Sequence, residues 1–244
     1  MGIPSEYPCQ MTTMFNERNP AFRRLSTTQN TVRSVIGVAR IIAGLLVLSG
    51  IITEIVDTLA HSAFKPDHYF AYFTIESSMM NVVVLVVGGV FAVRHPVDTR
   101  LLSTVRMAVL SYAVVTAIVY NVLLRNIPSN GDYQGPHWPT EVFHVAIPIL
   151  LVLDWILTPG RVPVRWRSLA LVASYPLAWL AFTMIRGGLG GWYPYPFLEP
   201  GGPGGVLSVV IYCVVLTAVI LGFACAAIAI SRAGSRQAGR PAAA

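Results

Sequence analysis

Six long apolar runs constrain the fold of this chain more than any other feature of its sequence. Most of them approach or exceed the roughly 20 residues that a helix needs to cross the hydrocarbon layer of a bilayer. The composition agrees, because 55% of the residues are hydrophobic and only 11% are charged, against about 25% charged in an average soluble domain. The runs cover residues 35–59, 69–93, 101–124, 142–157, 169–185 and 206–230. We therefore predict an all-α, polytopic membrane protein that folds as a six-transmembrane-helix bundle.

The six runs belong to one transmembrane domain, residues 34–231, which lies between two tails. Residues 1–33 and 232–244 are polar or biased in composition, so we expect both tails to be poorly ordered. The segment before the first run is longer than the n-region of a signal peptide, and the run itself is longer than an h-region. The first run is therefore expected to be an anchoring helix.

Basic residues are distributed unevenly among the connections. Twelve arginines lie before the first run, between runs two and three, between runs four and five, and after the sixth. The remaining connections and their rims hold Lys65, Arg125 and Arg186. This positive-inside pattern predicts that both termini are cytoplasmic. We expect a multi-pass protein of the plasma membrane. Because the net charge of +6 follows the same pattern, we expect the membrane, and no nucleic acid, as a partner.

With this orientation, polar side chains gather at one depth near the outer ends of the runs. Charges at such a depth are costly unless they are paired or face a wet cavity, so the layer is a candidate site. Its members come from five of the six runs and are Glu54, Asp57, Thr74, Glu76, Tyr120, Asn121, Glu141, His144 and Arg186.

The second run carries a stripe of polar residues. Thr74, Ser77, Ser78 and Asn81 follow the spacing of one helix face, which we expect to line the interior of the bundle. Glu76 lies about 200° from Thr74 around the helix and is expected to contact a neighbouring helix or a partner at the rim. Alternatively, the hydroxyl groups of the stripe bond back to helix carbonyls or hold helices together.

Thr74 and His144 combine into a possible catalytic pair. A threonine hydroxyl is a poor nucleophile until a base accepts its proton, and a histidine at matching depth on a facing helix could do so. Glu141, three residues before His144, could reach the imidazole and fix its tautomer. The alternatives are that His144 is an interhelical hydrogen-bonding residue and that Glu141 is a surface charge at a helix start.

Other chemistries have less support in the sequence. The motifs G-x-S-x-G, H-E-x-x-H and G-x-x-x-x-G-K-[ST] do not occur, and Cys213 and Cys225 lack metal-ligand spacing. A haem would need two histidines that face each other inside the bundle. The other histidines, His61, His68, His95 and His137, fall in connections or at rims. We therefore predict neither a metal nor a cofactor.

The connection after the fifth run is rich in glycine, proline and aromatic residues. Residues 187–205 contain eight glycines and four prolines, which rule out a regular helix. The aromatic residues Trp192, Tyr193, Tyr195 and Phe197 suit the outer membrane interface. The segment is expected to be either a lid over the polar layer or an aromatic anchor in the headgroup region.

Four separated stretches resemble the Pr-six-Pr family of bacterial six-helix membrane proteins: "YFTIESSMMNVV", "VTAIVYNVLLRN", "FHVAIPILLVLDWIL" and "MIRGG...YPYPFLEP". The resemblance runs from about Arg33 to the sixth run. These proteins are distantly similar to the androgen-induced transmembrane hydrolases, which cleave fatty acid esters of hydroxy fatty acids. The resemblance implies that Thr74 and His144 are the catalytic pair. Glu76 and Ser78 depart from the family, which usually has glutamine and asparagine there.

Two functions follow from these observations, and both take a lipid or an amphiphilic small molecule as the ligand. In an intramembrane hydrolase of lipid esters, Thr74 would be the nucleophile and His144 its base. Contacts to the substrate or oxyanion would then come from Asn121, Tyr120, Arg186, Ser77 and Ser78. In a non-catalytic binder or transporter, the carboxylates and Arg186 would instead form an ion-paired gate.

Overall fold

The computed structural model of the chain describes residues 25–125 and 135–237, and these residues form helices joined by short connections. Six helical segments are long and apolar enough to cross a membrane, which confirms the predicted all-α six-helix bundle of a multi-pass membrane protein. They are α2 (Thr27–Ala60), α4 (Phe73–Arg94), α5 (Arg100–Val119) with η2 (Tyr120–Leu124), α6 (His137–Glu141) with η3 (Val142–Ala146) and α7 (Ile147–Leu157), α8 (Ser168–Gly190) and α9 (Gly205–Gln237). Two short helices, α3 (Pro66–Tyr69) and η4 (Pro196–Leu198), lie in connections.

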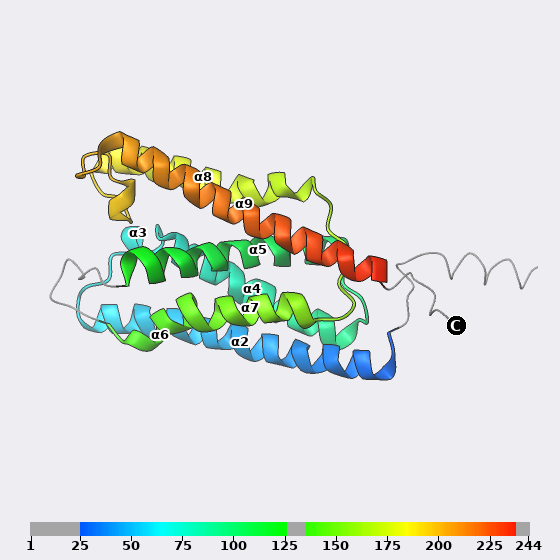
Figure 1. Cartoon of the computed structure of the whole chain (residues 1–244). Helices are drawn as coiled ribbons and strands as arrows, with labels where there is room; N and C mark the ends of the chain where they lie inside the picture. The colour runs from blue at the N-terminus through cyan, green and yellow to red at the C-terminus, as the bar shows by residue number, and fades with distance from the viewer. Residues whose placement is uncertain (1–24, 126–134, 238–244) are drawn as a thin grey trace, which may run out of the picture.

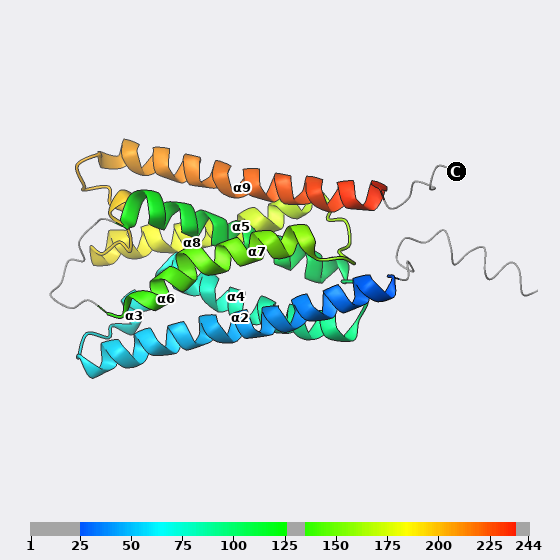
Figure 2. The same ribbon diagram turned by 60° about the horizontal axis from the view of Figure 1, so that its bottom comes forward.

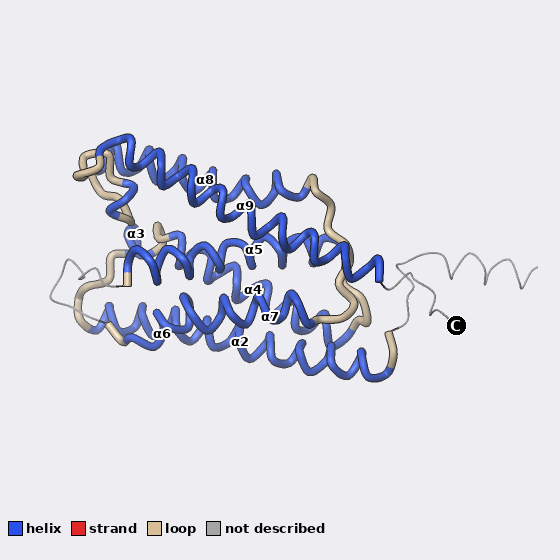
Figure 3. Tube along the Cα trace, in the orientation of Figure 1, coloured by secondary structure: helices blue, strands red, loops and turns tan. Residues whose placement is uncertain are grey.

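The helices run roughly along one common axis, and the loops gather at its two ends (Figures 1 and 3). The start of α2 and the end of α9 lie at one end, which we call the base; α3 and η4 lie at the other, which we call the top (Figure 1). On one side of the bundle α2 pairs with α4, while on the other α8 and α9 pack on each other and on α5. A second view, turned by 60°, likewise shows α2 on one side of the bundle and α9 on the opposite side (Figure 2).

The α2–α4 pair approaches closely because glycines face each other. A Cβ atom at Gly89 would lie only 2.5 Å from the carbonyl oxygen of Gly37, and one at Gly37 only 2.8 Å from the carbonyl oxygen of Gly89. Small residues at such crossings let two backbones come together, which is a common way of packing helices in membranes. The contact fixes α4, and with it the residues of its first turn at the top.

The helix ends differ from the predicted boundaries in several places. Helix α8 continues to Gly190, so the expectation that residues 187–205 contain no regular helix is wrong for 187–190; the helix ends only where Gly191 adopts the left-handed conformation. Helix α2 begins at Thr27, because Ser26 and Gln29 form a capping box ahead of it. Residues 27–33 are thus helical, whereas residues 1–24 of the predicted N-terminal tail lie outside the described residues. Helix α9 continues to Gln237, beyond the predicted domain boundary at residue 231, and residues 238–244 are again outside the described part. Helix α4 starts at Phe73 rather than at residue 69 because α3 and a turn precede it.

Candidate functional site

The first turn of α4 meets the fourth span at the top of the bundle. Thr74 is the second residue of α4, and its Oγ1 lies 3.4 Å from Nε2 of His144, although the two residues are 70 positions apart in sequence. His144 is buried, with 9% of its surface exposed. The structure therefore brings together the two residues that the sequence pairs as nucleophile and base.

The tautomer of His144 follows from its second hydrogen bond. Nδ1 lies 2.8 Å from the carbonyl oxygen of Thr140, and a carbonyl oxygen can only accept. In a neutral imidazole Nδ1 therefore carries the proton and Nε2 carries the lone pair. That lone pair faces the Thr74 hydroxyl, which donates to it. The ring is thus prepared to accept a proton from Thr74.

The predicted role of Glu141 in fixing this tautomer is wrong. Its carboxylate lies 2.8 Å from Nη2 of Arg125 in an ion pair that is partly open to solvent. The backbone carbonyl of Thr140 takes the position that we expected for the carboxylate. The reason is local: a side chain four residues after a carbonyl lies on the same helix face, so the imidazole reaches the backbone before it reaches Glu141.

Two π-turns face each other across this part of the bundle. The amide of Arg125 donates to the carbonyl of Tyr120 at 2.7 Å, and the amide of Ile147 donates to that of Val142. Both bonds span five residues, which is the π-helical pattern and occurs frequently at functional sites. The wider turns place the ring of Tyr120 flat against that of His144, with 4.0 Å between the ring centroids.

Asn121 supports the histidine segment rather than the reacting atoms. Its Nδ2 donates to the carbonyl oxygens of Ala117, at 2.8 Å, and His144, at 3.1 Å, while its Oδ1 accepts from Nε of Arg125. Both amide hydrogens are therefore used on the backbone. In this arrangement the side chain ties η2 to η3, which is a different task from the oxyanion contact expected from the sequence.

Tyr195 contributes a third functional group that the sequence reasoning did not place in the site. Its hydroxyl lies 3.4 Å from Oγ1 of Thr74 and accepts the backbone N–H of Thr74 at 3.4 Å. Burial raises the pKa of Tyr195 to about 12, so the hydroxyl stays protonated at neutral pH. The only sequence signal was its place among the aromatic residues of segment 187–205, which fits an interfacial anchor equally well.

An apolar pocket opens beside Thr74 and Tyr195. Its volume is about 80 Å³, room for roughly five to eight groups the size of a water molecule. The walls come from α4, α5, α8, α9 and η4, and include Val119, Trp179, Leu216, Thr217 and Ile220. The pocket therefore places a hydrocarbon-lined space directly next to the Thr74 hydroxyl.

Most other members of the predicted polar layer pair elsewhere. Each of these side chains has a partner away from Thr74: Glu54 binds the Tyr69 hydroxyl at 2.9 Å, Glu76 the Tyr175 hydroxyl at 2.7 Å, Arg186 the Asp67 carboxylate at 3.1 Å, and Asp57 lies 3.7 Å from His61. The pairing of Glu76 with a neighbouring helix, α8, confirms the predicted direction of that side chain.

The two serines of the stripe are buried in the bundle. Ser77 donates to the carbonyl oxygen of Thr74 at 3.1 Å, which is the back-bonding alternative considered for this face. Neither Ser77 nor Ser78 lines the apolar pocket. The structure thus gathers Thr74, His144 and their aromatic neighbours into one site and leaves the serines behind it.

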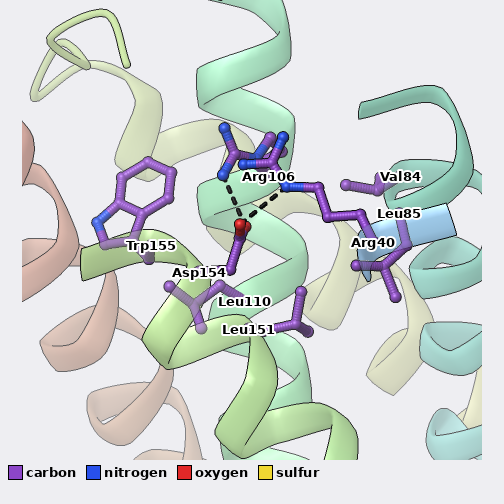
Figure 4. Close-up of a pocket in the computed structure, with 8 residues that line it drawn as sticks. All are labelled: Arg40, Val84, Leu85, Arg106, Leu110, Leu151, Asp154 and Trp155. Atoms are coloured by element: carbon purple, nitrogen blue, oxygen red, sulfur yellow. Dashed lines mark hydrogen bonds and ion pairs between the residues drawn. The ribbon is translucent and has the colours of Figure 1, made fainter. Parts of the chain in front are cut away.

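A second polar cluster lies buried toward the base. The Asp154 carboxylate accepts from Nε of Arg40 at 2.8 Å and from Nη2 of Arg106 at 2.7 Å (Figure 4). Asp98 pairs with Arg106 as well, and also with Arg33. The cluster links α2, α5, α7 and the connection before α5 through charges that are almost completely removed from solvent.

Little space remains at this second cluster. The cavity lined by Arg40, Arg106, Asp154 and Trp155 has a volume of about 10 Å³, about the room of a single water molecule. The other two side-chain nitrogens of Arg40 donate to the carbonyl oxygen of Gly88 and to the hydroxyl of Thr158. We therefore interpret the cluster as a structural connection between helices. In the described part of the chain, moreover, no three His, Cys, Asp or Glu side chains are grouped as a metal ion would require.

Comparison with protein-family models, with curated proteins and with solved structures finds no match for this chain. The functional argument therefore depends on the geometry around Thr74.

Proposed function

We propose that the protein is an intramembrane hydrolase of lipid esters, in which Thr74 is the nucleophile and His144 its general base. The observation that carries the proposal is the 3.4 Å separation of Oγ1 of Thr74 from Nε2 of His144, with the lone pair of Nε2 on the threonine side. Apo geometry of this kind is often loose and tightens when substrate binds. The site lies at the end of the bundle that the arginine pattern predicts to face outward, in the plasma membrane.

The reaction needs no group beyond the chain, the ester and water. Oγ1 of Thr74 attacks the ester carbonyl carbon while its proton moves to Nε2 of His144, and the carbonyl electron pair moves to oxygen. The resulting imidazolium then gives this proton to the leaving alcohol oxygen as the carbon–oxygen bond breaks. Water attacks the acyl-threonine in a second round, and the products are a carboxylic acid and an alcohol.

The pocket supports a substrate with a hydrocarbon chain. Its walls are predominantly apolar, and Thr74 lies in its lining, so a chain bound in the pocket would bring an attached carbonyl to Oγ1. A site with little water lacks the solvent that would stabilise the charges formed when the proton moves to His144. Fixed dipoles of the protein must stabilise these charges instead. The N-terminus of α4, where Thr74 lies, supplies one such dipole.

Membership of the Pr-six-Pr family is part of the same proposal. The stretches that resemble the family include Thr74, His144 and Tyr195. The alternative, a binder or transporter of an amphiphile, has less support because the expected ion-paired gate is absent among the described residues. The carboxylates of Glu54 and Glu76 bind tyrosine hydroxyls, and Arg186 pairs with the exposed Asp67.

The test is turnover and probe labelling of purified full-length protein in detergent. Thr74→Ala should abolish labelling by a fluorophosphonate and lower the hydrolysis of a p-nitrophenyl octanoate ester by about 10³-fold or more. His144→Ala should act in the same way, and Thr74→Ser should retain part of the activity because it keeps a hydroxyl at the same position. The free energy of unfolding should change by only about 0.6 kcal/mol in Thr74→Ala, the average for a membrane hydrogen bond.

Ser77→Ala is the matched control, because it removes a hydroxyl one turn away that is bonded to the backbone. It should leave turnover within about twofold of the unmodified protein. Equal turnover in the unmodified protein, Thr74→Ala and Thr74→Ser would contradict the assignment.

A further inference from the structure

The hydrogen of the Tyr195 hydroxyl is available for donation to a bound substrate. It accepts the backbone N–H of Thr74, so its own hydrogen is free to be donated. Thr74 Oγ1 lies 3.4 Å away, but the proton of that hydroxyl is directed at His144. The Tyr195 hydrogen therefore either contacts the lone pairs of Oγ1 or points into the pocket, whose wall includes both residues.

The attack by Thr74 on an ester changes which oxygen is the better acceptor for this hydrogen. When a lone pair of Oγ1 forms the bond to the carbonyl carbon, Oγ1 becomes a poorer acceptor, while the carbonyl oxygen gains the electron pair and becomes a stronger one. A carbonyl that approaches from the pocket places this oxygen beside the Tyr195 hydroxyl. A donor fixed at such a position before reaction is the most effective kind of transition-state stabilisation.

We infer that Tyr195 is a further catalytic residue, whose hydroxyl donates the hydrogen bond that stabilises the oxyanion formed when Thr74 attacks the ester. The inference rests on the proposed function and deepens it. No proton leaves Tyr195 in this step: the Thr74 proton goes to His144, and the phenol remains a donor throughout. The N–H of Thr74, bonded to the phenol oxygen, polarises the O–H bond and strengthens the donor.

The ring of Tyr195 is held rigidly enough for this task. It stacks on Phe197 at 5.2 Å between centroids and meets Tyr72 edge-on at 5.6 Å. Only 7% of Tyr195 is exposed, and prolines precede and follow it in sequence, which restricts the backbone on both sides. The segment 187–205 thus places Tyr195 beside Thr74 and lines the pocket with Phe197 and Leu198 as well, which combines the lid interpretation with a chemical role.

Three other donor residues that the sequence or the structure places near the site already use their hydrogens elsewhere. Both amide hydrogens of Asn121 go to backbone carbonyls, Ser77 donates to the carbonyl of Thr74, and Arg186 pairs with Asp67. Tyr195 is the candidate that combines contact with the nucleophile, a place in the pocket wall and an uncommitted hydrogen.

The test uses the full chain in detergent with p-nitrophenyl octanoate as substrate. Tyr195→Phe keeps the ring and removes the hydroxyl, and should lower kcat by about 10²-fold or more, the usual effect of one oxyanion donor. KM should stay within about twofold, since the donor acts mainly in the transition state. Binding of an alkyl trifluoromethyl ketone, which forms a tetrahedral adduct, should weaken by a similar factor, whereas binding of octanoate should not. Tyr72→Phe, in the same aromatic cluster, should leave kcat within about threefold.

A second measurement separates chemistry from folding. Replacing Tyr195 by a ring-fluorinated tyrosine keeps the hydroxyl and lowers its pKa, so the donor becomes a phenolate at lower pH. Turnover should then acquire a new alkaline limb, which the unmodified protein lacks because burial raises the pKa of Tyr195 to about 12. The other titratable groups around Tyr195 are Tyr72, Tyr175, Cys213 in the same pocket wall and, beyond Thr74, His144, and they are the same in both proteins.

The outcomes divide clearly. Thr74-dependent turnover that is unaffected by Tyr195→Phe, or an unchanged pH profile in the fluorinated protein, would overturn the role of Tyr195 alone. Turnover that does not depend on Thr74 would overturn the proposed function and this inference together. If Tyr195→Phe does not fold, the pH profile of the fluorinated protein decides.

Discussion

The buried cluster at the base should be the most sensitive part of the fold, and Asp154→Ala is its sharpest perturbation. Asp154 is 8% exposed and accepts hydrogen bonds from Arg40, Arg106 and Thr158. Truncation to alanine leaves two buried guanidinium groups facing a space that holds about one water molecule (Figure 4). Neither group can turn to solvent without separating the helices that carry it.

Arg106 keeps its pair with Asp98, so the magnitude follows from the cost of leaving the buried charge of Arg40 without a carboxylate partner. Removing one member of a buried ion pair typically lowers the free energy of unfolding by about 3–5 kcal/mol. For a chain of this length that loss corresponds to a fall in Tm of about 6–20 °C. Asp154→Asn keeps the volume and one acceptor oxygen but removes the charge. It should therefore lower the free energy of unfolding by a large part of the amount expected for Asp154→Ala.

The assay is thermal unfolding of the purified protein in detergent, followed by tryptophan fluorescence. Asp67→Ala is the matched control, because Asp67 also pairs with an arginine, Arg186, but its side chain is 68% exposed. Exposed pairs contribute only about 0–1 kcal/mol. A Tm for Asp154→Ala within the range of the Asp67→Ala control would refute the interpretation of the base cluster as a structural connection.

Three further predictions concern orientation, packing and the pocket. In a cysteine-free background of intact cells, Gly201→Cys should react with a membrane-impermeant thiol reagent and Arg165→Cys should not; the opposite labelling would reverse the predicted orientation. Gly89→Val should lower the unfolding free energy by about 1–3 kcal/mol, measured by thermal unfolding, because its Cβ would meet the α2 backbone at 2.5 Å. Thr217→Phe should fill the pocket and reduce kcat/KM for an octanoate ester but not for an acetate ester. Val215→Phe, at a position that is 51% exposed, should leave kcat/KM for both esters unchanged. Equal losses on both esters in Thr217→Phe would argue against binding of the acyl chain in the pocket.

The fold could be predicted from the sequence because one physical requirement dominates it. A backbone in hydrocarbon must satisfy its own hydrogen bonds, so every long apolar run is expected to be helical. The helix ends were predicted less well, since they depend on local features such as the capping box of Ser26 and Gln29. The first turns of α2 are helical although their residues are polar, and Arg33 in the second turn reaches Asp98, a contact that no local pattern indicates.

The proximity of Thr74 and His144 was predictable from the sequence, whereas the other contacts of the candidate site were not. Thr74 and His144 could be paired because both lie near the start of runs that cross the membrane in the same direction, and therefore at the same depth. The π-turns have no established sequence signature, and Tyr195 reaches the site through a loop whose path depends on tertiary contacts. Arg40 and Arg106 did carry a signal: a charge inside an apolar run requires a buried partner, and Asp154 on the fourth run is of the right sign.

The hydrogen bond from the His144 ring to the Thr140 carbonyl has a consequence for how this site tolerates mutation. In many enzymes a carboxylate side chain orients the basic histidine, and its replacement inactivates the protein. Here the orienting atom belongs to the backbone, so it is retained whichever side chain occupies position 140. A saturation library at Thr140 should therefore keep most of its activity, while the same library at His144 should lose it. The group that sets the tautomer of the proposed base would then leave no trace in a mutational scan, and only the main-chain geometry of the segment would reveal it.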